Sequence, residues 1–253
     1  MFVPIRHFCM KLRGWPSHES LSQLACHVRN SSGLPVRFVK DSCENYEKRI
    51  YLEGEVHTRE ASWHDLFNAL VWMSFPKAKS FLNRLHVREM KKEEDGRRGK
   101  MRDIATLFDE SGVIVASSNP SLSNMLKRFE WKSLFLDNRK KVMEEMRFYI
   151  FGHGLYEKAL SPYVGLTGHA VLFHVEEAFF ALPIDMQIER LDSSFEQIFS
   201  KIATPRDLCP LPLLGVPGWA DGNEDPAYYD NESYFRRGRI RNGGQTGSVP
   251  RPK

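Results

Sequence analysis

A histidine, an aspartate and an asparagine lie within the strongly apolar stretch WHDLFNALVW, residues 63–72. At about 3.6 residues per turn, His64, Asp65 and Asn68 share one face of a helix, and leucine and phenylalanine occupy the other. A histidine with a carboxylate can perform general acid–base chemistry. The same pattern is also typical of an ordinary amphipathic helix with one wet face. Because Trp72 falls among the polar residues, we expect this face to form the wall of a cleft.

A second pair of candidates lies in FGHGLYEKAL, residues 151–160. His153 and Glu157 are four residues apart and therefore share one helix face. At this spacing the two side chains can bind one metal ion, or the carboxylate can orient the imidazole for proton transfer. A plain hydrogen-bonded pair has the same spacing. Gly152 and Gly154 allow close approach of a ligand or, alternatively, tight packing against another backbone.

We expect these two polar faces to meet, with His64 and Asp65 opposite His153 and Glu157. A histidine or carboxylate near tryptophan loses hydration and must regain that free energy from a partner or a metal. These four residues are the candidate catalytic groups. A divalent metal is the candidate cofactor, with His153, Glu157 and His169 as candidate ligands, although a lone histidine before an apolar strand is more often structural.

Other motifs with recognisable chemistry are absent from the sequence. There is no P-loop motif, no His-Glu-x-x-His and no Gly-x-Ser-x-Gly. P-loop nucleotide hydrolysis, zincin chemistry and the usual serine-hydrolase elbow are therefore unsupported. None of the four cysteines belongs to a Cys-x-x-Cys pair, so a zinc ribbon or a thioredoxin-like motif is not indicated, and free thiols are expected.

The helix that carries His64 is bounded by strong local signals. Ser62 is a good N-cap, and Pro76 discourages helix at Phe75. Similar reasoning from apolar spacing predicts the remaining helices and the isolated strands. The helices are expected at 17–28, 77–86, 121–130, 138–150, 152–160 and 193–202, and the strands at 36–39, 50–57 and 170–175.

Two β-prone runs, 103–108 and 113–116, flank Asp109-Glu110-Ser111-Gly112. Glycine can take the left-handed conformation of a tight turn, so this stretch predicts a hairpin. Segregated strand pairs of this kind favour an α+β fold over a doubly wound parallel sheet. The predicted fold is mainly helical with a small, largely antiparallel sheet.

The segment that follows Cys209 combines several prolines with Leu211, Leu213, Leu214, Val216 and Trp219. Prolines forbid a continuous helix or central strand, yet the segment is too apolar for a free linker. We expect it to pack on the body of the protein as an extended strap. Residues 1–241 are therefore predicted to form a single globular domain.

The basic residues are concentrated at the end of the chain. The net charge is +4, but residues 236–253 hold six basic residues and no acid, which leaves residues 1–235 at −2. A generally basic nucleic-acid-binding surface is thus not indicated. Residues 242–253, with only Val249 to bury, are predicted to be a disordered basic tail that contacts nucleic acid, such as RNA, or a protein partner.

Neither a membrane nor a secretory location is predicted. The apolar fraction is 42%, and no run approaches the roughly 20 apolar residues that span a bilayer. The first residues, MFVPIRHFCMKLRGW, do not resemble a secretory signal. A cytoplasmic location is expected.

Four blocks of the sequence resemble a known bacterial family. They are WHDLFNALVWMSFPKAKSFLN, RDIATLFDESGVIVAS, FGHGLYEKALSPYVGLTGHAVL and PLPLLGVPGWADGNEDPAYYDNESYFRRGR, and they occur in this order between about residues 60 and 240. They are similar to the family catalogued as domain of unknown function 3025. The resemblance implies a bacterial protein with one domain, and it implies no activity or catalytic residue. The family often closes with Phe-Arg-Pro, where this chain has Phe235-Arg236-Arg237.

Two functions from different classes are compatible with these features. The first is an enzyme, a metal-assisted hydrolase whose cleft holds histidines and carboxylates. The second is a non-enzymatic protein that binds RNA or a protein partner through a cleft or its basic tail. The two are distinguished by the metal content of the protein and by the distances among the five candidate side chains.

Overall fold

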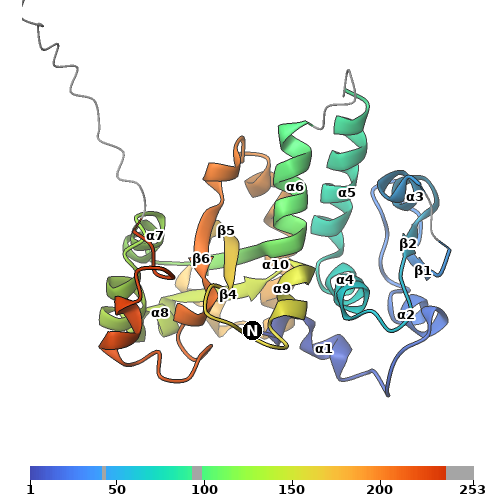
Figure 1. Ribbon diagram of the computed structural model, residues 1–253. Coiled ribbons are helices and arrows are strands. Elements are labelled where there is room, and N and C mark those ends of the chain that lie inside the picture. The colour runs from blue at the N-terminus through green and yellow to red at the C-terminus, as the bar shows by residue number, and fades with distance from the viewer. Residues whose placement is uncertain (42–43, 93–98, 238–253) are drawn as a thin grey trace, which may run out of the picture.

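The computed structural model describes residues 1–41, 44–92 and 99–237. Figure 1 shows residues 18–57 as a layer at one end of the molecule, with the helices of residues 63–111 beside it and a sheet in the middle. Residues 120–145 lie at the other end, together with the C-terminal segment.

The N-terminal layer contains short helices and a two-stranded parallel sheet. Its elements are α2 (His18–Leu24), β1 (Arg37–Val39), α3 (Tyr46–Glu53) and β2 (Glu55–His57). The elements before them, η1 (Val3–Ile5) and α1 (Arg6–Cys9), pack against α4 (Trp63–Ser74) instead. The prediction of extended structure over 50–57 is wrong for its first half. Helix α3 continues to Glu53 and ends at Gly54, whose φ of 73° is left-handed, and only then does β2 begin.

The two central helices confirm the predictions made from their capping residues. Helix α4 (Trp63–Ser74) begins after Ser62, whose side chain accepts a hydrogen bond from the backbone N–H of Asp65. Helix α5 (Pro76–Met90) follows at once. The N-terminus of α5 has no local side-chain cap. Asp192 of α10 (Ile184–Phe199) supplies one, since its carboxylate accepts from two backbone N–H groups of α5.

The predicted hairpin at 103–116 is wrong in its first strand. Helix α6 (Lys100–Ser111) occupies this stretch and runs directly into β3 (Gly112–Ser117). The reason is burial, because Ile104 and Phe108 are four residues apart and both are fully buried. Gly112 has a φ of −70°, and its lack of a side chain instead allows the backbone of Phe108 to lie close.

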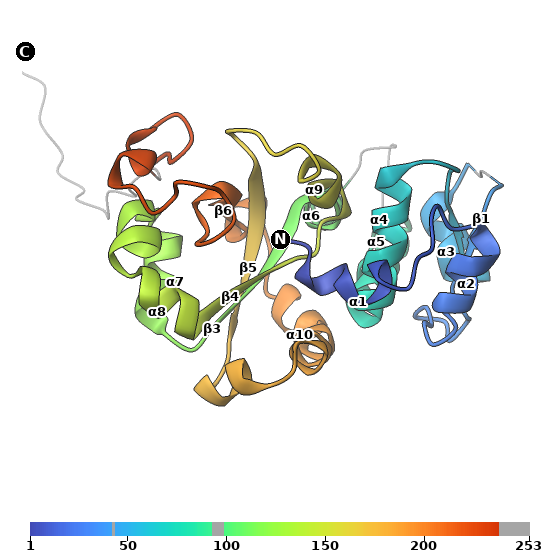
Figure 2. The same cartoon turned by 90° about the horizontal axis from the view of Figure 1, so that it is seen from below.

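The main sheet has four strands in the order β4-β3-β5-β6, where β4 is Met146–Ile150, β5 is Thr167–His174 and β6 is Cys209–Pro212. Strand β3 pairs antiparallel with β4 and parallel with β5, and β5 pairs antiparallel with β6. Figure 2 shows α10 on one side of this sheet and α7 and α8 on the other. The fold is thus α+β and mostly helical. The prediction of helix over 138–150 is wrong from Met146 onward, where β4 begins.

The remaining elements complete the cover of the sheet. They are α7 (Pro120–Lys127), η2 (Ser133–Asp137), α8 (Arg139–Glu145), α9 (His153–Lys158), η3 (Glu177–Ala181), η4 (Pro205–Asp207), η5 (Leu213–Gly215) and η6 (Pro226–Asp230). The segment after β6 packs on the body as the sequence predicted, with Leu213, Leu214 and Val216 buried. These side chains belong to a hydrophobic cluster that extends from the N-terminal layer through the sheet. The predicted tail at 242–253 lies outside the described residues.

Membrane-spanning helices are absent from the part of the chain that the structure describes: none of its helices is long and apolar enough to cross a bilayer.

Candidate functional site

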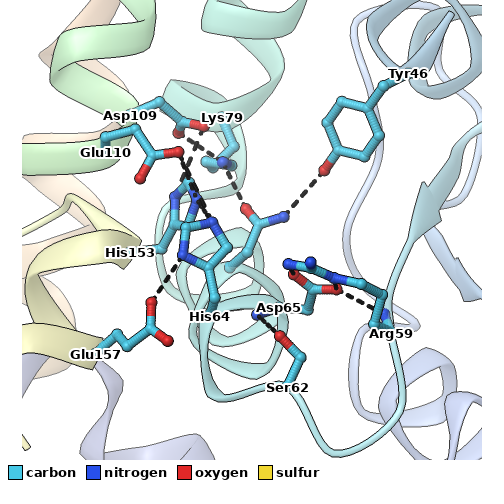
Figure 3. Close-up of polar contacts among 11 residues, drawn as sticks. Tyr46, Arg59, Ser62, His64, Asp65, Lys79, Asp109, Glu110, His153 and Glu157 are labelled. Carbon is cyan, nitrogen blue, oxygen red and sulfur yellow. Dashed lines mark hydrogen bonds and ion pairs between the residues drawn. The ribbon is translucent and has the colours of Figure 1, made fainter.

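The polar face of α4 meets the beginning of α9, as the sequence predicted. The Nε2 atoms of His64 and His153 are 3.0 Å apart, and their rings meet edge to face with centroids 4.5 Å apart (Figure 3). His153 is 5% exposed, whereas the side chain of His64 is about a third exposed. One histidine is therefore fixed in the body of the protein and the other faces a cavity.

A carboxylate that the sequence analysis did not select completes this group. Glu110, in the last turn of α6, places Oε1 3.7 Å from Nε2 of His64 and 3.5 Å from Nε2 of His153. One donor atom from each of the three residues lies within 4.8 Å of the other two. The pKa of Glu110 is lowered, chiefly by its interaction with His153, although burial acts in the opposite direction. The composition of Asp-Glu-Ser-Gly is typical of a turn, which conceals the helical position of Glu110 in the sequence. The helical spacing of the buried residues before it was the available signal.

Two glycines allow α9 and α6 to come this close. A Cβ on Gly152 would lie 2.5 Å from backbone atoms of Ser111 and Gly112, and one on Gly154 would lie 2.6 Å from Oε2 of Glu110. Gly152 therefore allows tight packing against another backbone, which is one of the two roles considered for these glycines. Gly154 leaves room for the carboxylate that faces His153.

The second nitrogen of each imidazole faces a further carboxylate. Nδ1 of His64 is 3.0 Å from Oε2 of Glu157. Nδ1 of His153 is 3.7 Å from Oδ2 of Asp109, and it is buried without a hydrogen-bond partner. Glu157 thus contacts one nitrogen of His64 and His153 contacts the other, and Glu157 is not part of the group formed by His64, Glu110 and His153.

A buried lysine holds Asp109. Nζ of Lys79 is 2.6 Å from Oδ1 of Asp109 and 2.8 Å from Oδ1 of Asn68, whose amide in turn donates to the hydroxyl of Tyr46 (Figure 3). Burial opposes ionisation of Asp109, but the charges of Lys79 and His153 outweigh it and lower the pKa of this carboxyl.

Asp65 has a different partner from the one expected. Its carboxylate accepts two hydrogen bonds of 2.9 Å from the guanidinium of Arg59 and one from the backbone N–H of that residue. Burial opposes the charge of Asp65, but these hydrogen bonds prevail and lower its pKa. Asp65 lines the same cavity as His64. It does not join the histidine pair, and it fixes the loop before α4.

Two further expectations need correction. His169 on β5 is not part of the group formed by His64, Glu110 and His153, and its Nδ1 is instead 2.8 Å from the hydroxyl of Ser111. Burial lowers the pKa of His169. Trp72 is 1% exposed, so it is core and does not form the cleft wall. Trp72 lies among the polar residues of α4, but α5 packs over it there, with Nζ of Lys79 5.5 Å from the centre of its ring.

The group opens into a cavity of about 520 Å³ between the N-terminal layer and α6. Residues from α3, β2, α4, α5, α6 and α9 line it. Tyr46 and Glu47 stand in its wall. Burial raises the pKa of Glu47 to about 7, which a hydrogen bond from Asn83 partly offsets. The site therefore has a carboxyl that changes its protonation near neutral pH.

Comparisons with known proteins assign the chain to a family but assign it no activity. No match was found among curated proteins or among solved structures. A family model described as protein of unknown function, DUF3025, matches residues 36–239. The match includes every residue of the group formed by His64, Glu110 and His153, together with the carboxylates behind it. The chain belongs to this family of unknown function, DUF3025.

Proposed function

We propose that the protein is a metal-assisted hydrolase whose divalent ion is held by Nε2 of His64, Nε2 of His153 and Oε1 of Glu110. The observation that carries the proposal is the convergence of these three donor atoms from α4, α9 and α6 at the edge of a cavity. Two imidazoles and one carboxylate are a ligand set known from catalytic zinc sites.

The spacing of the donor atoms fits one small cation. Ligand atoms at about 2.0–2.1 Å from a tetrahedral zinc ion are roughly 3.3–3.4 Å from one another. The three separations here are 3.0, 3.5 and 3.7 Å. Shifts of a few tenths of an ångström would bring all three to the required values.

The partners of the outer nitrogens support the same assignment. A carboxylate facing Nδ1 favours the tautomer with its proton on that nitrogen, and Nε2 then carries a lone pair. Glu157 faces Nδ1 of His64 and Asp109 faces that of His153. Two Nε2 lone pairs only 3.0 Å apart repel each other unless a proton or a cation lies between them. Histidine ligands of metals generally donate this outer N–H to a carboxylate, a backbone carbonyl or a water.

The proposed hydrolysis follows from a metal ion that has three protein ligands and one side open to the cavity. A divalent ion supplies a Lewis acid and acidifies a bound water to a pKa near about 7. The cavity of about 520 Å³ gives a substrate access to the exposed side of His64. We infer hydrolysis of an ester, amide or phosphoester, because each has an oxygen that such an ion polarises.

The test is the metal content of protein purified without a histidine tag, measured by elemental analysis, with His64→Ala, His153→Ala and Glu110→Gln as variants. We expect about one equivalent of metal in the wild type and its loss in each variant. His174→Ala is the matched control, since His174 is an exposed histidine at the end of β5. Hydrolysis of an ester and phosphoester panel should disappear with a chelator and return with the ion. Metal-free wild type that cannot be loaded with Zn²⁺, Mn²⁺ or Fe²⁺ contradicts the proposal.

The proposed cellular setting is the bacterial cytoplasm. Cys9, Cys26 and Cys209 carry free thiols, as is usual in a reducing compartment. If the metal test fails, binding of RNA or a protein partner becomes the preferred function. The basic tail of this chain, which would make such a contact, lies outside the described residues.

A further inference from the structure

The inner histidine of the group has an unusual environment for a buried imidazole. His153 is 5% exposed, and its Nδ1 has no hydrogen-bond partner. Buried polar atoms are nearly always paired, because an unmade hydrogen bond costs free energy. The group that faces this nitrogen is Oδ2 of Asp109, at 3.7 Å. An approach of less than 1 Å would close the hydrogen bond.

Asp109 is held in place by a fixed, buried cation. The side chain of Lys79 is 5% exposed and that of Asp109 is 23% exposed. Nζ of Lys79 contacts Asp109 at 2.6 Å and Asn68 at 2.8 Å, and it lies 5.5 Å from the centre of the Trp72 ring. Burying a lysine is costly in free energy unless its charge is paired, and here one carboxylate and one amide oxygen pair with it.

We propose that Asp109 and Lys79 together are positioning residues for His153, and this inference rests on the proposed metal site. Lys79 fixes the position of Asp109 through their 2.6 Å contact. The carboxylate of Asp109 accepts a hydrogen bond from Nδ1–H of His153, so that Nε2 presents its lone pair toward His64 and Glu110. Asn68 and Tyr46 extend the same chain of contacts to the cavity wall, where Asn68 limits the positions that Lys79 can occupy.

The carboxylates behind the two histidines differ in how much of their side chains is exposed to solvent. Glu157, behind His64, has a side chain that is 47% exposed, so water can replace it. Asp109 is half as exposed and is anchored by Lys79. Removing the charge of Asp109 should therefore weaken metal binding more than removing that of Glu157.

The test measures Zn²⁺ affinity of the full chain by competition with a chelator. We expect Asp109→Asn and Lys79→Met each to lower the affinity by about 10- to 100-fold, the usual effect of removing an outer partner of a histidine ligand. The double variant should bind Zn²⁺ no more weakly than the weaker-binding of the two single variants, because the two residues act as a unit. Glu157→Gln should lose less than Asp109→Asn does.

The matched control is Glu55→Gln, which breaks an ion pair of similar length and burial: Arg49 and Glu55 are 2.6 Å apart, and Glu55 is 17% exposed. Glu55→Gln should lower the melting temperature and leave Zn²⁺ affinity unchanged. If the Lys79–Asp109 pair were purely structural, Asp109→Asn and Lys79→Met would behave in the same way. Affinities of Asp109→Asn and Lys79→Met within about twofold of the wild type would therefore overturn the inference.

A second readout needs no metal. Long-range ¹H–¹⁵N spectra of the metal-free wild type report which nitrogen of His153 carries the proton, with His153→Gln for assignment. We expect the Nδ1–H tautomer, and a shift toward the other tautomer in Asp109→Asn. An Nε2–H tautomer in the wild type contradicts the positioning role. The Nδ1–H tautomer in a chain that binds no metal would instead reject the proposed function and leave the role of Asp109 standing.

Discussion

At the scale of single residues, the site depends on which atoms of two histidines face each other. The Nε2 atoms of His64 and His153 are 3.0 Å apart, and Glu110 stands within 3.7 Å of both. Each of the three residues comes from a different helix. A cation shared by them would link the three helices and stabilise the folded state by its binding free energy.

Zn²⁺ should therefore raise the melting temperature of the wild type. At a free concentration of about 100 times Kd the gain is about 2.7 kcal/mol, which corresponds to a rise of roughly 5–10 °C for a chain of this size. His64→Ala and His153→Ala should each abolish the rise, and the double variant should lose nothing more. Differential scanning fluorimetry with His174→Ala as control measures this effect. A rise that persists in both single variants would place the ion elsewhere.

At the scale of elements, helices are joined by groups that lie far apart in the sequence. The N-terminus of α5 is capped by Asp192, which lies 115 residues beyond Lys77. The start of α9 fits against the end of α6 because Gly152 has no side chain. Each of these two features can be tested by one substitution.

Asp192 makes stability depend on pH in a stated direction. Burial raises its pKa to about 6, although hydrogen bonds from the backbone of Ala78 and Lys77 act against the shift. An unfolded aspartate titrates near about 3.9, so the folded chain holds the extra proton between about pH 4 and pH 6. The free energy of unfolding should fall as pH rises through this window, by up to about 3 kcal/mol. Urea titrations of Asp192→Asn should lack this part of the slope, and an unchanged slope would refute the assignment.

Gly152→Ala should destabilise the protein by about 1–3 kcal/mol, since overpacking against rigid atoms costs that much. The added Cβ would lie 2.5 Å from backbone atoms of Ser111 and Gly112. Gly154→Ala provides the comparison, because the first atom that its Cβ meets is the carboxylate of Glu110, which can move. The second variant should lose Zn²⁺ affinity more than stability. Denaturant titration and chelator competition distinguish the two, and equal effects of both variants on both quantities would contradict this view.

At the scale of the whole molecule, the C-terminal strap and the sheet share one hydrophobic cluster. Leu213 is fully buried, and its side chain lies close to Gly168 on β5. The strap thus begins as β6, the edge strand of the sheet, which pairs with β5.

Leu213→Ala should lower the free energy of unfolding by about 2–5 kcal/mol, the range for truncation of a buried leucine. Far-UV circular dichroism and tryptophan fluorescence should still report one coincident transition if residues 1–241 unfold as a single domain. Two separate transitions would show that the chain has two domains. A near-neutral effect would show that the strap is loosely attached.

Deletion of residues 242–253 should change the melting temperature by less than about 1 °C, because the segment contains only one residue able to bury much apolar surface, Val249. A loss of several degrees in thermal unfolding would show that the tail packs on the folded protein.

The sequence by itself determined features that depend on a few neighbouring residues. Ser62 and Pro76 set the ends of α4, and the i,i+4 spacing put His153 and Glu157 on one side of α9. The expected meeting of His64 with His153 also proved correct, since two dehydrated polar faces stabilise each other.

Tertiary packing decided the rest. Residues 103–108 are β-prone by composition, but Phe108 packs on Phe195 and Phe199 of α10, and this burial outweighs local propensity. The resulting helix carries Asp109 and Glu110 into the site. Asp65 went to Arg59 instead of the histidines, because adjacent residues of a helix point about 100° apart. Local signals act over one or two turns, whereas the partner of a carboxylate is chosen by whatever the fold brings within about 3 Å of it.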